Sequence, residues 1–168
     1  MQNRKKQIAA KVCSVIGTLL LLVAILICIP LTLPRLAGYQ IYHVISGSME
    51  PAIHIESVVY VKDVAPADIQ KKDVIAFHSV LGEEAIITHR VVSNNRVAGE
   101  IVTKGDANAK EDMEPVPYEN VLGKVALTVP VLGKILATIA TIQGKAAVGS
   151  VILLALLLHI VAGRLRKS

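Results

Sequence analysis

Three short segments of the chain contain the side chains that hydrolytic chemistry uses: a serine, a histidine and several acids. The first is SGSMEP at residues 46–51, where Gly47 permits a sharp backbone bend that exposes Ser48, and Ser46 supplies a second hydroxyl two residues earlier. A serine hydroxyl needs a base before it can act as a nucleophile. On this segment alone, a plain Ser/Gly turn between two strands is therefore the stronger interpretation.

The other two segments supply a base and a carboxylate. His89 lies inside a run of β-branched residues at 85–93, and a strand histidine more often packs or faces solvent than acts in catalysis. The third segment, KGD at 104–106, is followed by Glu111 and Asp112. Acid-rich turns usually face water or bind a cation through oxygen ligands, and this spacing is not that of an EF-hand loop. An acid that orients the histidine is the sharper alternative.

The elements that must position these segments are short and rich in valine and isoleucine, which predicts strands. Turn signals separate them, including Leu81-Gly82 and Asn94-Asn95, and the second pair has the composition of a tight hairpin turn. The pattern predicts a mainly β fold, a small irregular β-barrel or sandwich, over residues 39–129. The predicted strands are 41–46, 57–62, 73–79, 85–93, 96–103 and 121–129.

Two apolar segments enclose this region. Residues 12–33 carry no charge over 22 residues, and residues 146–163 carry none over 18. As helices they would reach about 33 and 27 Å, against a bilayer hydrocarbon core of about 30 Å. Both are predicted to be transmembrane helices with the lipid bilayer as their partner. A cleaved secretory signal is the alternative for the first segment, but no convincing cleavage site follows it, and Pro30 and Pro34 mark its end.

Basic tails lie on the outer side of both apolar segments, at residues 1–11 and 164–168. This is the positive-inside pattern, and it predicts both termini in the cytoplasm and residues 39–129 on the outer face of a cell membrane. Residues 130–144 are apolar and weakly helical, which favours an interfacial helix over a plain connector. His159 lies in the second segment and is expected to face another helix.

The charge and cysteine distributions exclude several classes of protein. Residues 39–127 contain eight basic and thirteen acidic side chains, a net charge of −5, although the whole chain carries +5. No basic stripe is available for phosphates, so nucleic acid is not an expected partner. Both cysteines, Cys13 and Cys28, lie in the first apolar segment. The exported region therefore has no disulfide framework and no cysteine metal site, and we expect no metal or cofactor.

Taken together, the three segments resemble those of the type I signal peptidases. The order Ser, His, Asp occurs in one small β-rich region that follows a hydrophobic anchor, and the resemblance covers roughly residues 40–129. The motifs are specific as a set and less so one by one. The chain is similar to the branch with a Ser-His-Asp site, as in endoplasmic-reticulum, archaeal and some Gram-positive enzymes. The segments are SGSMEP (46–51), ITHRVV (87–92) and TKGDAN (103–108) with Asp112.

The resemblance implies a role for each of these residues. Ser48 is the nucleophile, and His89 is the general base at the position where the other branch has a lysine. Asp112 is the orienting carboxylate, and Asp106 is a supporting one. Because Asp106 follows Gly105 at a strand end, we also expect it to cap N–H groups of its turn. Ser46 and the Ser48 N–H bind the oxyanion. The family often has two adjacent aspartates where this chain has Glu111-Asp112, which leaves open which acid contacts the histidine.

The resemblance also implies a substrate: signal peptides of exported preproteins, cut after a small residue with another small residue two positions earlier. We expect an edge strand of the enzyme to hold the peptide extended. Two alternatives remain. One is an inactive anchored relative that binds or assembles exported proteins. The other is a self-cleaving repressor protease, which would use a Ser-Lys pair and a DNA-binding domain, and neither is present here.

Overall fold

A computed structural model describes residues 2–79 and 85–167, so the Leu81-Gly82 turn lies outside the described residues. The chain divides into two compact units. One contains Met1–Thr32 together with Ala137–Ser168, and the other contains Leu33–Leu136.

The first unit is built from two long helices, α1 (Gln2–Leu36) and α3 (Ile142–Lys167). Among the described residues, two helical segments are long and apolar enough to cross a membrane, Arg4–Pro30 and Ile142–Arg166. These helices indicate a membrane protein and confirm the two predicted apolar helices. The apolar span ends at Pro30, and α1 itself ends at Leu36, just after Pro34, before Gly38, at φ 82°, turns the chain.

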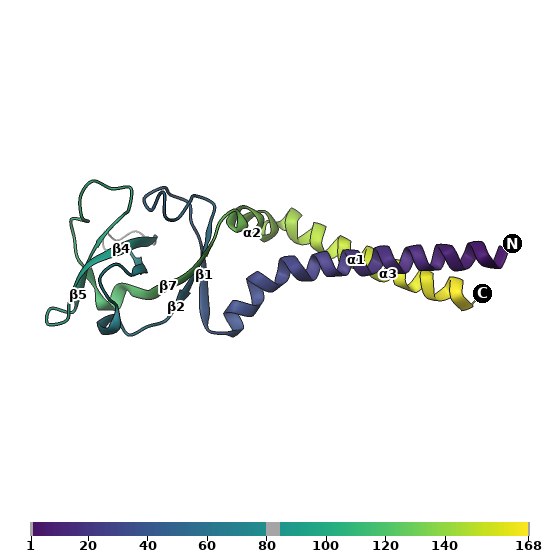
Figure 1. The fold of residues 1–168 in the computed structure, drawn as a ribbon, viewed down its shortest axis with the longest axis horizontal. Helices are drawn as coiled ribbons and strands as arrows, with labels where there is room; N and C mark the ends of the chain where they lie inside the picture. The colour runs from purple at the N-terminus through teal and green to yellow at the C-terminus, as the bar shows by residue number, and fades with distance from the viewer. Residues whose placement is uncertain (1, 80–84, 168) are drawn as a thin grey trace. The chain divides into compact units, whose positions relative to one another are not determined.

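Small residues let the two helices approach closely. A Cβ built at Gly17 would lie 3.0 Å from the Ala155 carbonyl oxygen and 3.1 Å from the His159 ring. The Thr18 hydroxyl lies 3.5 Å from Nε2 of His159, so this histidine has a polar partner on the other helix, as expected. Figure 1 shows the two helices side by side, with the chain termini at the same end of this unit.

The second unit is a single antiparallel sheet. In the described residues it has seven strands in the order β1-β2-β7-β3-β4-β5-β6, with β1 and β6 at its edges. This confirms the mainly β prediction, with one curled open sheet in place of a closed barrel or a two-sheet sandwich. The strands are β1 (Tyr39–His43), β2 (Val58–Lys62), β3 (Val74–His78), β4 (Ile86–Asn95), β5 (Glu100–Lys104), β6 (Val116–Pro117) and β7 (Val121–Val129).

Two hydrophobic clusters form the core of the described part of this sheet. The first includes Ile75, Phe77 and Val91, from β3 and β4. The second includes Met49 and Val61 and packs under the SGSMEP segment. The β-branched residues that predicted strands therefore also supply the core, because alternate side chains of a strand share one face of the sheet.

The turn predicted at Asn94-Asn95 was wrong. β4 includes both asparagines, and the turn follows them, ending at Gly99 with φ 72°. The Asn95 carboxamide oxygen accepts hydrogen bonds from the N–H groups of Val97 and Ala98, 3.2 and 3.1 Å away. Asn95 therefore stabilises the turn from its first position, as asparagine side chains often do.

The segment after the sheet is helical, as predicted. Helix α2 spans Leu132–Ala140, and its beginning is attached to the sheet by a 2.9 Å hydrogen bond from the Gly133 N–H to the Glu56 carbonyl oxygen. Val131, just before the helix, has φ 66°, which is strained for a β-branched residue. Two short 3₁₀ helices, Pro66–Asp68 and Tyr118–Asn120, complete the described elements between the strands.

Candidate active site

The segment that carries Ser48 is a compact turn between β1 and β2. The Glu50 N–H donates to the Gly47 carbonyl oxygen at 3.0 Å, and the Ile53 N–H donates to the Met49 carbonyl oxygen at 2.9 Å. Met49 is buried in the second core cluster, which anchors the turn from below. Ser48 is half-buried beside it, so the turn presents the serine hydroxyl from a fixed base.

An ion pair closes the same turn on its exposed side. His54 Nδ1 lies 2.6 Å from Oε2 of Glu50, and the Ile55 N–H donates to the other carboxylate oxygen at 3.2 Å. The hydrogen bond from His54 lowers the pKa of Glu50 below its usual value. Glu50 therefore holds the two ends of the turn together as a carboxylate.

His89 lies in the middle of β4 and is only 8% exposed. Its Nδ1 is 2.6 Å from Oδ2 of Asp112, and the same oxygen accepts a 2.6 Å hydrogen bond from the Thr103 hydroxyl. The ring also meets Phe77 edge to face, with centroids 6.2 Å apart. The carboxylate and the aromatic ring together fix the orientation of the imidazole, and a proton on Nδ1 leaves Nε2 as the basic nitrogen.

The residue next to His89 pairs with the other acid. Arg90 donates two hydrogen bonds to Asp106, from Nε at 2.7 Å and from Nη2 at 2.6 Å, and a third from Nη1 to the Lys72 carbonyl oxygen at 2.9 Å. The Arg90 guanidinium lowers the pKa of Asp106, mainly through these hydrogen bonds. The prediction that Asp106 caps N–H groups of its own turn was wrong, because an arginine from β4 engages both of its carboxylate oxygens.

The segment between the two acids also touches the serine turn. The Ala107 N–H donates to the Ser48 carbonyl oxygen at 2.9 Å, and a Cβ built at Gly105 would lie 2.6 Å from the same oxygen. Only glycine allows this approach. The Asp112 N–H in turn donates to the Thr103 carbonyl oxygen at 2.9 Å. One segment, residues 103–112, therefore attaches the serine turn to the carboxylate that contacts His89.

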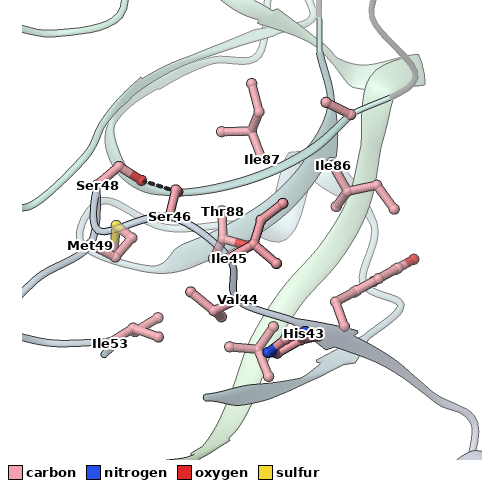
Figure 2. A pocket seen from close by; sticks show the side chains of 13 residues that line it. His43, Val44, Ile45, Ser46, Ser48, Met49, Ile53, Ile86, Ile87 and Thr88 are labelled. Atoms are coloured by element: carbon pink, nitrogen blue, oxygen red, sulfur yellow. Dashed lines mark hydrogen bonds between the residues drawn. The ribbon is translucent and has the colours of Figure 1, made fainter. Parts of the chain in front are cut away.

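A pocket of about 490 Å³ opens beside Ser48. Figure 2 shows the Ser46 and Ser48 hydroxyls at one side of it, with Ile86 and His43 on other sides. Its walls come from the chain around Ser48 and from the beginning of β4. Most of them are apolar: Tyr42, Val44, Ile45, Met49, Ile53, Val59, Ala85, Ile86 and Ile87 line it together with Thr88.

The structure brings all five predicted site residues into one region, and their pairing can be stated. Ser46 and Ser48 are neighbours, with 3.5 Å between the hydroxyl oxygens. His89 pairs with Asp112, and Asp106 pairs with Arg90. Among the described residues, no hydrogen bond joins Ser48 to His89. Catalytic hydrogen bonds are often long or misaligned before substrate binds, so this arrangement is compatible with a serine nucleophile and a histidine base.

Two contributors were missed by reasoning from the sequence. Thr103 is the last β-branched residue before KGD, and nothing in its type or position indicates a role in the site. Its contact with Asp112 depends on a turn made by the following nine residues. Arg90 stands beside His89 in sequence. Alternation along a strand could have placed it on the opposite face, facing a different partner.

Comparison with known proteins shows two similar signal peptidases. The chain is 38% identical over 91 residues to signal peptidase I W of Bacillus subtilis (strain 168), which covers 52% of this chain and 47% of that protein. It is 30% identical over 108 residues to the signal peptidase complex catalytic subunit SEC11 of Ogataea parapolymorpha, which covers 54% of this chain and 61% of that subunit. No family model matches the chain.

These similarities confirm the resemblance to the type I signal peptidases that the three motifs predicted. The matched part spans about half the length of the first relative and about three-fifths of the second, 47% and 61%.

Proposed function

We propose that this chain is a membrane-anchored serine endopeptidase that removes signal peptides from exported preproteins. The observation that carries the proposal is the His89–Asp112 pair, at 2.6 Å, on the strand that also lines the pocket beside Ser48. A serine alone or a buried histidine alone supports a structural role equally well. An imidazole held by a carboxylate next to an exposed serine turn is the arrangement that serine hydrolysis requires.

In the first step, Ser48 attacks the carbonyl carbon of the peptide bond after the signal peptide. Its hydroxyl turns from Ser46 toward Nε2 of His89, which takes the proton, and Asp112 stabilises the resulting imidazolium through Nδ1. The developing oxyanion is received by the Ser48 N–H and the Ser46 hydroxyl. The tetrahedral intermediate then collapses, His89 gives its proton to the leaving amine, and the signal peptide remains as an ester on Ser48.

The second step frees the enzyme. A water molecule gives a proton to His89 and attacks the ester carbonyl carbon, and the same two donors receive the oxyanion. Ser48 leaves as the alkoxide and takes the proton back from His89. The signal peptide departs with a new carboxylate, and every proton that His89 accepts is returned within one cycle.

The pocket fits the substrate that the similarity to signal peptidases implies. Its apolar walls from Val44, Met49 and Ile87 suit small apolar side chains near the cut. β1 is an edge strand, and the chain continues from it directly to Ser48. An extended peptide can therefore run beside this segment and gain affinity through main-chain hydrogen bonds, while the pocket selects side chains.

The membrane arrangement is part of the proposal. Both termini lie in the cytoplasm and residues 39–129 on the outer face of the cell membrane, because basic residues flank the outer sides of both apolar helices. Tags placed at Gln2 and at Ser168 test this when intact cells are treated with protease. Both tags are expected to survive, and loss of either tag from the outside would overturn the two-span topology.

The test of function compares wild type with Ser48→Ala on a purified preprotein. Wild type is expected to release the signal peptide, and the variant is expected to lose cleavage while remaining membrane-bound, because the Ser48 hydroxyl has no packing role. Cleavage by the variant within a few-fold of wild type would remove Ser48 from the mechanism. A wild-type protein that binds the preprotein without cutting it would favour the inactive relative.

A further inference from the structure

A basic hollow lies on the other side of His89 from the pocket. It has a volume of about 280 Å³, and its lining includes four cationic side chains: Lys71, Lys72, Arg90 and Lys104. The domain around it is acidic, with eight basic against thirteen acidic residues over 39–127, so half of its basic side chains line this one hollow. Among the described lining residues, Asp106 is the one acid, and Arg90 already engages both of its oxygens.

The three lysines therefore supply the uncompensated charge of the hollow. Lys71 and Lys72 are exposed, while Lys104 is half-buried and lies opposite Arg90 in the β4–β5 register. Lys104 lies close enough to Asp106 to help lower the pKa of that carboxyl, after the larger effect of Arg90. An anionic group that entered the hollow would find three cations and no free carboxylate among the described lining residues.

Strand β4 fixes the order of the pocket, the proposed base and the hollow. Residues 85–88 line the pocket, His89 follows, and residues 90–92 line the hollow. Thr88 and Arg90 point to the same face of the sheet and lie about 7 Å apart along the strand. The segment after Lys104 also holds the Ser48 carbonyl oxygen through the Ala107 N–H. The hollow therefore adjoins the segment that holds the serine turn.

We propose that this basic hollow binds acidic side chains of the mature segment, within about the first four residues after the cut. The inference rests on the proposed function. If the signal peptide occupies the pocket up to Ser48, the chain that leaves past His89 runs toward residues 90–92. At about 3.3 Å per extended residue, three or four residues reach about 10–13 Å, which exceeds the spacing of about 7 Å along β4 between Thr88, in the pocket, and Arg90, in the hollow. The hollow is then a specificity site for the leaving fragment, separate from the apolar pocket.

The size and salt dependence of the effect follow from the exposure of the lysines. Exposed ion pairs contribute little each, so two acidic residues against this cluster are expected to change kcat/KM by about 3- to 10-fold. Most of the gain is expected in KM, because the contact is present before and during the reaction alike. It is expected to disappear in high salt, where the Debye length falls from about 10 Å at 0.1 M to about 3 Å at 1 M.

The experiment uses the purified full-length chain and three preproteins that differ only at the third and fourth residues after the cut: Glu-Glu, Gln-Gln or Lys-Lys. We expect kcat/KM in the order Glu-Glu, Gln-Gln, Lys-Lys at low salt, and nearly equal values at high salt. Lys71→Gln/Lys72→Gln, which changes two exposed side chains of the hollow, is expected to remove the preference while cleaving the Gln-Gln substrate at the wild-type rate. The matched control, Lys62→Gln/Arg96→Gln, removes the same net charge outside the hollow and is expected to keep the preference.

The outcomes separate the two proposals. Equal cleavage of all three substrates by wild type at low salt would overturn the hollow and leave the peptidase intact. A preference that survives Lys71→Gln/Lys72→Gln, or that disappears equally in Lys62→Gln/Arg96→Gln, would also overturn it, because overall charge rather than this site would be responsible. Wild-type protein that cleaves none of the substrates would overturn the proposed function and the hollow with it.

Discussion

Two neighbouring residues of β4 each pair with an acid from the same segment, and the two pairs differ in chemistry. His89 is buried and meets Asp112, which a threonine also holds. Arg90 is about one-third exposed, 34%, and forms a two-hydrogen-bond ion pair with Asp106. Alternation along the strand sends the two side chains to opposite faces of the sheet.

The difference separates a pair that can move a proton from one that cannot. Imidazole changes charge near neutral pH, whereas guanidinium stays charged under all physiological conditions. The Arg90–Asp106 pair therefore has a positioning role. It joins β4 to the turn whose Ala107 N–H donates to the Ser48 carbonyl oxygen. The His89–Asp112 pair is the one suited to catalysis, and two substitutions and one pH experiment test this division.

Asp112→Asn is expected to have the largest effect. The carboxylate selects the imidazole tautomer and stabilises the imidazolium, and its loss from a Ser-His-Asp site without loss of fold costs about 10⁴ in kcat. Thr103 can still donate to the amide oxygen, so we expect a folded protein that binds preprotein. Single-turnover cleavage beside a melting curve in detergent measures both. If Asp112→Asn and Asp106→Asn were both active, Glu111 would become the next candidate.

Asp106→Asn is expected to lose stability together with part of its activity. The ion pair contributes about 1–2 kcal/mol, after a discount for the exposure of Arg90. Each kcal/mol corresponds to a Tm decrease of about 4–8 °C in a domain of this size. Activity is expected to fall by about tenfold as the turn beside Ser48 loosens. An inactive Asp106→Asn variant with an unchanged melting curve would exchange the roles of the two acids.

Acid pH is expected to separate the two pairs in one experiment. Activity falls first, because a protonated imidazole cannot accept a proton from serine. The pKa of Asp106 is lowered in the folded protein, so the stability it confers is complete above the ordinary aspartate value of about 3.9 and is lost as pH falls through the lowered value. Melting curves should therefore stay constant at the pH where cleavage is lost.

The smallest effect on activity is expected from a third pair of side chains. Glu50 and His54 close the serine turn, with side chains 36% and 61% exposed. Glu50→Gln is expected to change kcat/KM by less than about threefold, because exposed pairs of this kind are weak. His54→Gln serves as the matched variant and is expected to behave alike. A tenfold loss in both would show that this pair, too, positions Ser48.

The sequence predicted the type of fold and the chemical groups better than their contacts. The β-branched runs and the apolar helices depend on local patterns, which a sequence displays directly. The Asn94-Asn95 turn failed for a long-range reason. Asn94 stays in β4 because its side chain donates to the Pro66 and Ile69 carbonyl oxygens and accepts from the Tyr118 hydroxyl. Turn propensity cannot compete with three such hydrogen bonds.

The sequence did not show which of the two acids contacts His89, and the reason is also long-range. Asp106 and Asp112 are both near a turn, and nothing local distinguishes them. The register of β4 against β5 decides, because it places Arg90 opposite Lys104 and Val91 opposite Thr103. Asp106 then meets the arginine, and Asp112, brought back to Thr103, meets the histidine. The contacts of the two acids therefore depend on how β4 and β5 pair, which the local sequence around each acid does not show.

The strand order has a consequence for how the molecule forms. β7 lies between β2 and β3, although it is the last strand to be synthesised. Before β7 is added, the sheet consists of two parts with unpaired edges. One is the β1–β2 hairpin, whose turn carries Ser48, and the other is the β3–β4–β5 meander, which carries His89. Such long-range pairing slows folding and exposes edges that can pair wrongly. The serine and the histidine therefore belong to one rigid body only after the final strand has been inserted, so a chain cut short before residue 121 would carry every proposed catalytic residue and no assembled site.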